Sequence, residues 1–265
     1  MQVVIPMSGL GSRFSAAGYS EIKPLISVMG RPMISWVCEL FPGAEDFLFI
    51  CREEHLLETG LRTVLNELKP NATIVAIPGH KKGPVHAINL ASEYINDEDE
   101  VIVNYCDYFM DWNFAHFREF NRTSGALGVV PCYTGFHPHL LHRENKYAVC
   151  RTGPDGWVSE IREKHRFTEN PEDDFHSAGC YYFKSGKLLK QLFSEMENRD
   201  DLCINGEWYV SLIYTLMIEK GMKVKVYDQI KHFCQWGTPA DLQEFENWDK
   251  IMKHIKNGSV FTKNL

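Results

Sequence analysis

The sequence predicts an α/β protein with a Rossmann-like sheet that is mixed but mostly parallel and is flanked by helices. In residues 1–135, short apolar runs alternate with segments that have the apolar spacing of helices. The runs are continuously apolar, which is typical of parallel strands buried on both faces. Hydrophobic residues make up 44% of the 265 residues, enough for a full core. We expect one domain over residues 1–265.

The expected elements of the first part follow each other in βα order. Leucines 56, 57, 61, 65 and 68 have helical spacing, and Pro32 stands where a helix tolerates a missing N–H. The predicted strands cover residues 3–7, 46–51, 72–77, 101–106 and 126–133. The predicted helices cover residues 32–40, 53–68, 85–94 and 112–120.

The second part changes character after about residue 136. Turn residues Gly153-Pro154-Asp155-Gly156 separate the first two apolar runs. The predicted strands cover residues 147–150, 157–162, 179–183 and 222–227, and the predicted helices cover 186–196, 207–220 and 239–255. No internal repeat and no linker rich in Pro, Gly or Ser marks a domain boundary.

Composition excludes several classes of protein. Lys and Arg number 28 against 35 Asp and Glu, a net charge of −7, which disfavours a chain-wide nucleic-acid binder. No apolar run reaches the roughly 18 residues that a membrane span needs, and the N-terminus lacks a secretory signal. The eight cysteines include no C-x-x-C pair, so we expect buried free thiols in a cytoplasmic protein with neither nucleic-acid nor membrane partners.

A glycine-rich turn follows the first predicted strand. Gly9 and Gly11 allow backbone N–H groups to approach an anion, and the cations Arg13 and Lys23 lie on the same long loop. Phe14 stands where the dinucleotide-binding fingerprint has its third glycine, and the loop is not a Walker A motif. We therefore expect an anion site at the carboxyl edge of the sheet.

Three linked segments resemble the signature of the nucleotidyltransferases that are often called sugar-nucleotide pyrophosphorylases. That signature reads G-x-G-[TS]-R, then K-P-[LM], then G-[KR]-P-[ML]-[IL]. Two further segments resemble the family's metal-binding aspartate and its C-terminal W-G-T-P-x-D-L. The matching segments here are Gly9-Leu10-Gly11-Ser12-Arg13, Lys23-Pro24-Leu25, Gly30-Arg31-Pro32-Met33-Ile34, Tyr105-Cys106-Asp107 and Trp236-Gly237-Thr238-Pro239-Ala240-Asp241-Leu242.

The resemblance implies a fold of the nucleotide-diphospho-sugar transferase type and a reaction. A phosphorylated small molecule attacks the α-phosphorus of a nucleoside triphosphate, and pyrophosphate leaves. Arg13 would act on the pyrophosphate, Lys23 would lie between the two reacting phosphates, and Asp107 would hold Mg²⁺ or Mn²⁺ and contact substrate. The nucleotide-binding half, residues 1–135, would bind the nucleotide through Ser8, Gly9, Leu10, Gly11, Ser12, Lys82 and Gly83.

The same resemblance places the acceptor in the half formed by residues 136–265. Glu163 and Lys164 resemble the family's E-K pair, Gly179 belongs to an acceptor-side strand, and Glu207 is expected to add a polar contact. For Lys82 and Gly83, an ordinary solvated lysine pair beside a helix start is an equally good interpretation.

The metal site departs from the family pattern. Many members have an aspartate shortly before the C-terminal Gly-Thr, but this chain has Gln235 and no acid from Gln229 to Pro239. Either one carboxylate is sufficient or the second comes from elsewhere. Asp111 is expected either to assist the metal or to cap the helix that begins at Trp112.

The histidines and one acidic run have alternative interpretations. His137, His139 and His142 form an H-x-H-x-x-H that is compatible with zinc but more typical of a polar surface loop. His165 and His176 flank the acceptor segments, where they could contact a substrate anion. The acidic run 169–174 is expected to be a mobile, solvated loop.

Alternatives remain for the reaction and for the substrates. A glycosyltransferase of the related fold would use an acidic metal motif, and a regulatory domain would bind nucleotide without turnover. Within the family, the chain resembles cytidylyltransferases of bacterial capsule and surface-polysaccharide pathways, which favours CTP as donor and phosphoglutamine as acceptor. Sugar 1-phosphates are the alternative acceptors, and a homo-oligomer stays open.

Overall fold

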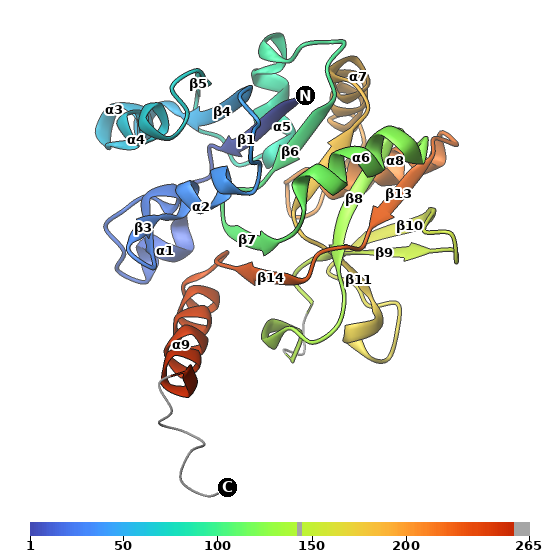
Figure 1. Ribbon diagram of the computed structural model, residues 1–265. Helices are drawn as coiled ribbons and strands as arrows, with labels where there is room; N and C mark the ends of the chain where they lie inside the picture. The colour runs from blue at the N-terminus through green and yellow to red at the C-terminus, as the bar shows by residue number, and fades with distance from the viewer. Residues whose placement is uncertain (142–144, 257–265) are drawn as a thin grey trace, which may run out of the picture.

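The computed structural model of the protein describes residues 1–141 and 145–256 (Figure 1). Four parallel strands form the N-terminal part of the central sheet, and most of their residues are apolar and buried. Val4 of the first strand pairs with Leu48 on one side and Val103 on the other. These strands are β1 (Gln2–Met7), β4 (Phe47–Arg52), β5 (Thr73–Ile77) and β6 (Val101–Asn104).

The second half of the chain extends the same sheet with mixed pairing. Strand β12 (Cys180–Phe183) is antiparallel to β6 and to β8 (Gly128–Tyr133), and β13 (Val224–Tyr227) is parallel to β8. The sheet order is β10-β9-β11-β8-β12-β6-β1-β4-β5, with β13 beside β8. The added strands are β9 (Ala148–Thr152), β10 (Val158–Glu163) and β11 (Phe175–Ser177). The predicted mixed α/β sheet is confirmed.

Helices cover both faces of the sheet, as Figure 1 shows. Alternate residues of β1 point to opposite faces, so that Val4 belongs to one hydrophobic core and Val3 and Ile5 to the other. The core around Val4 is covered by α5 (Pro84–Leu90), α7 (Gly186–Met196) and α8 (Ile213–Glu219). The opposite core is covered by α2 (Met33–Glu39), α3 (Glu53–Glu58), α4 (Leu61–Leu68) and α6 (Phe114–Ser124).

Four predicted helices differ from the structure. The helix expected over 85–94 ends at Leu90, and a separate 3-10 turn follows at Ser92–Tyr94. The helix expected over 53–68 is interrupted at Gly60, where the hydroxyl of Thr59 accepts from the N–H of Leu61. The helix expected over 207–220 is reduced to α8 and a preceding 3-10 turn. The helix expected from Trp112 begins at Phe114 with Asn113 as its cap, so Asp111 does not cap it.

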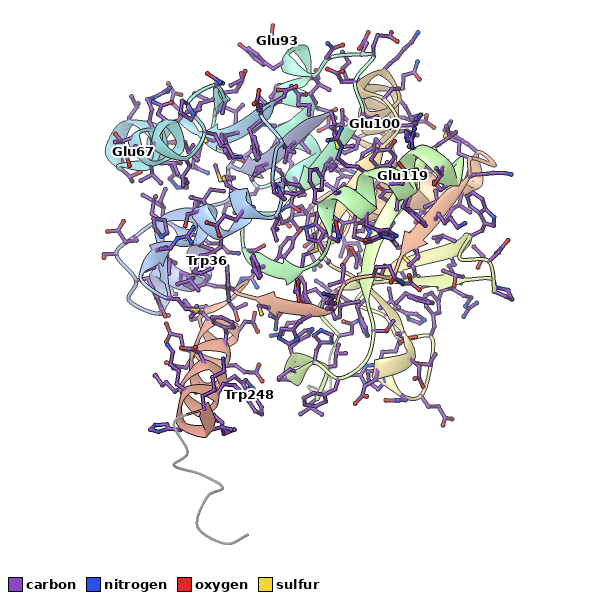
Figure 2. All side chains as sticks on the ribbon, in the orientation of Figure 1. Trp36, Glu67, Glu93, Glu100, Glu119 and Trp248 are labelled. Carbon is purple, nitrogen blue, oxygen red and sulfur yellow. The ribbon has the colours of Figure 1, made fainter. Side chains whose placement is uncertain are left out.

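Short elements that the sequence pattern did not predict surround the edge of the sheet. Strands β7 (Tyr108–Asp111) and β14 (His232–Gln235) pair antiparallel, and β14 leads into α9 (Pro239–Lys256). The first crossover contains α1 (Ser12–Ala16), a 3-10 turn at Lys23–Leu25 and the hairpin of β2 (Ser27–Val28) and β3 (Arg31–Pro32). Trp36 of α2, labelled in Figure 2, donates its ring N–H to the carbonyl of Val28 and fixes this hairpin.

The run 169–174, expected to be a solvated loop, is exposed at Glu169, Asn170 and Asp173 but is anchored to the protein at Asp174. Asn170 caps a 3-10 turn at Pro171–Asp173, and the buried carboxylate of Asp174 accepts from the N–H of Phe167. All eight cysteines are free thiols, and six of them are buried. Among the described helices, none combines the length and apolar character needed to cross a bilayer.

Candidate active site

A cleft of about 170 Å³ lies at the carboxyl edge of β6, between the first crossover and strands β9, β10 and β11. Its charged lining residues come from five separate segments of the chain: Arg13, Asp107, Lys146, Glu163 and Asp241. Ligands of open α/β sheets bind at this edge. Of the residues predicted for the nucleotide end, Arg13 and Asp107 line this cleft, whereas residues 8–12 and Lys23 are not part of its lining.

The predicted phosphate loop follows β1 directly. Gly11 has φ +64°, and a Cβ at this position would lie 3.5 Å from Cβ of Lys23, so the turn packs closely on the second cationic segment. Ser8 is buried, with its hydroxyl 3.1 Å from Nε2 of His80. Gly9 and Leu10 are exposed, and Arg13 extends from α1 to line the cleft.

Lys23 and Asp107 form an ion pair at the edge of the site. Nζ of Lys23 lies 2.5 Å from Oδ2 of Asp107 and 3.1 Å from the carbonyl oxygen of Gly237. The backbone N–H of Trp236 donates to the carbonyl of Asp107 at 2.8 Å. The first crossover, the end of β6 and the C-terminal motif therefore meet at one point.

A small third core explains why these segments stay together. Phe14 and Val28 from the first crossover pack with Trp236 and Leu242 from the C-terminal motif, and each is at most 2% exposed. Burial of such side chains stabilises each by about 1.5–3 kcal/mol. The packing fixes Lys23 relative to Gly237.

Asp241 supplies a second carboxylate that the sequence interpretation missed. A Cβ on Gly237 would lie 3.4 Å from Oδ2 of Asp107 and 3.6 Å from Oδ2 of Asp241, so the two carboxylates flank this glycine. Asp241 is buried, and its Oδ1 accepts from Nε2 of Gln235 at 3.1 Å and from Nζ of Lys146 at 3.4 Å. The signal was present, since Asp241 is the acid of the W-G-T-P-x-D-L segment.

Of the residues predicted to contact the acceptor, Glu163 and Gly179 line the cleft. Glu163 ends β10, accepts a hydrogen bond from the hydroxyl of Ser211, and has its carboxyl pKa raised by burial. Gly179 has φ +78°, and a Cβ there would lie 3.1 Å from the ring of Tyr105. Lys164 is exposed at φ +53°, with Nζ 5.9 Å from the ring of Tyr209.

Comparison with known proteins supplies the family. The model of the nucleotidyl transferase family matches residues 2–210. The chain belongs to the nucleotidyl transferase family. Curated relatives include the bifunctional protein GlmU of Clostridioides difficile, 25% identical over 244 residues, which cover 85% of this chain and 46% of the relative. GlmU of Methanocaldococcus jannaschii is 23% identical over 259 residues, which cover 97% of this chain and 56% of the relative. The chain thus spans about half the length of these relatives.

Solved structures share the fold of this nucleotidyl transferase family member. The nucleoside-diphosphate-sugar pyrophosphorylase from Vibrio cholerae RC9 aligns with a TM-score of 0.75 at 20% identity, covering 93% of this chain and 100% of that one. The inositol-1-phosphate CTP transferase from T. maritima aligns with a TM-score of 0.69 at 18% identity, with 94% and 95% covered. A UDP-glucose pyrophosphorylase complexed with UDP-glucose aligns with a TM-score of 0.71 at 16% identity, covering 95% of this chain and 98% of that one.

The predicted nucleotide loop at Lys82 and Gly83 packs against the segment that contains Glu207. The carbonyl of Lys82 accepts from the N–H of Trp208 at 3.0 Å, and a Cβ on Gly83 would come within 2.9 Å of the Trp208 carbonyl. Glu207 bonds the hydroxyl of Tyr209. Lys82, Gly83 and Glu207 therefore adjoin the cleft without lining it, and their substrate contacts stay predictions.

The histidines do not form a metal site in the described part of the chain. His137 uses both ring nitrogens, since Nε2 accepts from the N–H of Phe233 and Nδ1 lies 3.2 Å from the carbonyl of Gly135. Nε2 of His139 lies 2.8 Å from the hydroxyl of Tyr133. Within residues 1–141 and 145–256, no group of three His, Cys, Asp or Glu residues could hold a metal ion. His142, the third histidine of the pattern, lies outside the described residues, so the structure does not test the zinc alternative for the three together.

The remaining predicted residues lie away from the cleft lining. Asp111 is exposed at the end of β7, opposite His232 of β14. His165 contacts the ring of Phe167, and His176 is buried with Nε2 2.8 Å from the carbonyl of Pro171. The structure therefore gives none of the three a place in the cleft.

Proposed function

We propose that the chain transfers a nucleoside monophosphate from a nucleoside triphosphate to a phosphorylated small molecule. An oxygen of the acceptor phosphate forms the new bond to the α-phosphorus, the bond from that phosphorus to the bridging oxygen breaks, and pyrophosphate leaves with the electron pair. The observation that carries this proposal is the contact of Lys23 with Asp107, which lines the cleft together with Arg13, beside the glycine-rich turn. Catalysis of this kind depends mainly on positioning and charge neutralisation.

The roles follow from position. Lys23 is fixed between Asp107 and the Gly237 carbonyl before substrate binds, so its charge lies beside two residues that line the cleft. There it reduces the repulsion between the α-phosphate and the acceptor phosphate. Arg13 contacts the leaving pyrophosphate, and the N–H groups of the turn bind the triphosphate. The nucleophile is already an anion, so no general base is required.

The carboxylates suit Mg²⁺ or Mn²⁺. Asp107 and Asp241 offer hard oxygen donors on either side of Gly237, and Mg²⁺ in nucleotide enzymes is commonly held by one or two carboxylates together with substrate phosphates. Bound there, the ion would neutralise charge on the phosphate oxygens. Many family members have their second carboxylate where this chain has Gln235, and Asp241 would take over its role.

CTP is the donor that we propose and phosphoglutamine the acceptor, in the synthesis of a capsule or surface-polysaccharide precursor. The motif resemblance supports this choice, and the neighbour named as an inositol-1-phosphate CTP transferase supports a cytidylyl donor. Sugar 1-phosphates are the second acceptor class, favoured by the names of the pyrophosphorylase neighbours.

The test measures pyrophosphate release with each of the four ribonucleoside triphosphates against glucose 1-phosphate, phosphocholine and phosphoglutamine. Release with one triphosphate and at least one acceptor supports the proposal. Turnover of a preformed nucleotide sugar, without release from any triphosphate, would instead identify a glycosyltransferase. Nucleotide binding without any turnover would identify a regulatory domain.

A homo-oligomer formed through α9 is part of the proposal. Trp248 (Figure 2), Ile251, Met252 and Ile255 make an exposed apolar stripe on this helix, which extends away from the sheet. The first half of α9 is acidic and the second half is basic, so two copies packed antiparallel would place opposite charges together. Light scattering should give the mass of a dimer, and Trp248→Glu should give a monomer; a monomer of the unaltered protein contradicts this part.

A further inference from the structure

We propose that the acceptor end of the cleft binds an alkylammonium group, so that the acceptor carries a positive charge at the end opposite its phosphate. The ammonium would lie against a cluster that we call the tyrosine cluster: Tyr105, Tyr181, Tyr209 and the carboxylate of Glu163. The inference rests on the proposed function for the phosphate end of the acceptor, and it selects among the acceptor classes that the function leaves open.

The four members of the tyrosine cluster lie close to one another. All four line the same cleft. The rings of Tyr105 and Tyr181 have centroids 5.7 Å apart at an angle of 67°. The negative charge of Glu163 contributes to raising the pKa of each of the three tyrosines. Such an effect requires that the charged groups lie near one another. Ring faces around a carboxylate attract an organic cation.

The phenolic oxygens already have hydrogen-bonding partners within the protein. The hydroxyl of Tyr105 accepts from the N–H of Val210 at 3.4 Å, and that of Tyr181 accepts from Oγ of Ser177 at 3.1 Å. The hydroxyl of Tyr209 bonds Glu207. A sugar requires a hydrogen-bonding partner for each buried hydroxyl. Apart from the O–H donors of its phenols, the tyrosine cluster offers ring surface and one carboxylate, a combination that suits an ammonium.

Glu163 has too few partners for a buried charge. Burial raises the pKa of its carboxyl, and the hydroxyl of Ser211 donates to it. Among the described residues, no Lys, Arg or His forms an ion pair with Glu163. The charge of Lys164 acts on this carboxyl and partly offsets the rise in its pKa, but its Nζ is placed 5.9 Å from the ring centroid of Tyr209. A desolvated carboxylate without a counter-charge is costly, and a cationic ligand would stabilise it.

The test compares acceptors that differ in one charge. Phosphocholine and 3,3-dimethylbutyl phosphate have the same shape, but the second has carbon in place of the quaternary nitrogen. We expect kcat/KM, with the triphosphate that releases most pyrophosphate, to be about tenfold or more higher for phosphocholine. Phosphoethanolamine distinguishes a primary from a quaternary ammonium, and glucose 1-phosphate represents the sugars. Calorimetry with a non-hydrolysable triphosphate analogue measures the same preference without turnover.

Variants test whether the preference for the charged acceptor depends on the tyrosine cluster. Glu163→Gln should reduce the ratio between phosphocholine and its neutral analogue to near one, whereas Glu160→Gln should retain it. Glu160 lies on the same strand but pairs with Arg151 and Arg162 outside the cleft. Tyr209→Leu should reduce the ratio more than Tyr209→Phe, which keeps the ring. Circular dichroism and melting temperature establish that each variant is folded.

The outcomes separate this inference from the proposed function. Pyrophosphate release with the neutral analogue or glucose 1-phosphate at equal or greater efficiency overturns the ammonium site and leaves the transferase intact. Charge-selective binding without pyrophosphate release from any acceptor supports the ammonium site and contradicts the transferase. Equal or absent binding of phosphocholine and its neutral analogue overturns the ammonium site.

Discussion

Nζ of Lys23 lies 2.5 Å from Oδ2 of Asp107, a residue 84 positions further along the chain. This ion pair joins the first crossover to the end of β6, and its partly buried setting limits screening by water. In the proposed reaction, Lys23 neutralises charge on the phosphates that react, and Asp107 would hold the divalent ion. Their contact therefore orients the catalytic groups before substrate binds.

Replacing Lys23 should abolish catalysis without unfolding the protein. Lys23→Ala removes the cation between two phosphates, and we expect the rate of pyrophosphate release to fall at least about 100-fold. The melting temperature should change by only a few degrees, because the third core remains. Lys187→Ala on the exposed face of α7 is the control and should keep full activity. Normal turnover by Lys23→Ala would remove this residue from the mechanism.

The two carboxylates should differ in their effects. Asp107→Asn should lower the turnover rate about 100-fold or more, whereas Asp241→Asn should mainly raise the Mg²⁺ concentration for half-maximal rate, by about tenfold. Electron paramagnetic resonance of Mn²⁺ in the presence of nucleotide measures the metal affinity independently of turnover. Asp228→Asn, an exposed change outside the cleft, should alter neither quantity. An unchanged metal affinity in Asp241→Asn would exclude it as a ligand.

Stability should decrease in mild acid because of His137. Burial lowers the pKa of His137 to about 4, and its Nε2 must stay unprotonated to accept from the N–H of Phe233. Between pH 6.5 and about 4, the unfolded chain binds a proton that the folded chain does not. The free energy of unfolding should therefore fall with decreasing pH in this window, by about 3 kcal/mol from this residue.

Urea denaturation at several pH values measures that loss. The nearby rings of His176 and His232 share the environment of His137, and burial also lowers the pKa of His176, so part of the slope should remain in any single variant. His137→Gln should make the curve flatter between pH 6.5 and 4. A curve that retains the full slope would assign the pH dependence to other groups.

Gly83 should be more sensitive to substitution than a glycine of similar backbone conformation. Gly83 and Gly206 have φ +85° and +81°, but a Cβ on Gly83 would lie 2.9 Å from the Trp208 carbonyl, while Gly206 has open space. We expect Gly83→Ala to lower the free energy of unfolding by about 2–4 kcal/mol and Gly206→Ala by about 1–2 kcal/mol. Equal losses in chemical denaturation would show that the loop moves without cost.

The sequence predicted the elements with strong local patterns. The helix Gly186–Met196 agrees at both ends, and the strands of the parallel part were found because each is a continuous apolar run. The pairing of β7 with β14 joins residues that are more than 120 positions apart, and neither strand alternates clearly. Its stability comes from tertiary contacts, which the local pattern does not contain.

The motifs predicted the cations and the first carboxylate of the site but not the complete site. Asp241 was missed because it lies six residues after Gln235, and only the turn at Gly237 places its carboxylate near Asp107. Tyr209 was missed because residues 207–209 were expected to be helical. The loop that contains Gly83 instead holds this segment beside the cleft. Both misses concern segments whose position depends on distant contacts.

A crystal structure with Mg²⁺ and a non-hydrolysable CTP analogue tests the central claim most directly. We predict that the triphosphate lies against the turn at Gly9–Arg13, with Nζ of Lys23 within hydrogen-bond distance of an α-phosphate oxygen. A nucleotide bound in another part of the protein, away from both Arg13 and Lys23, would contradict the account.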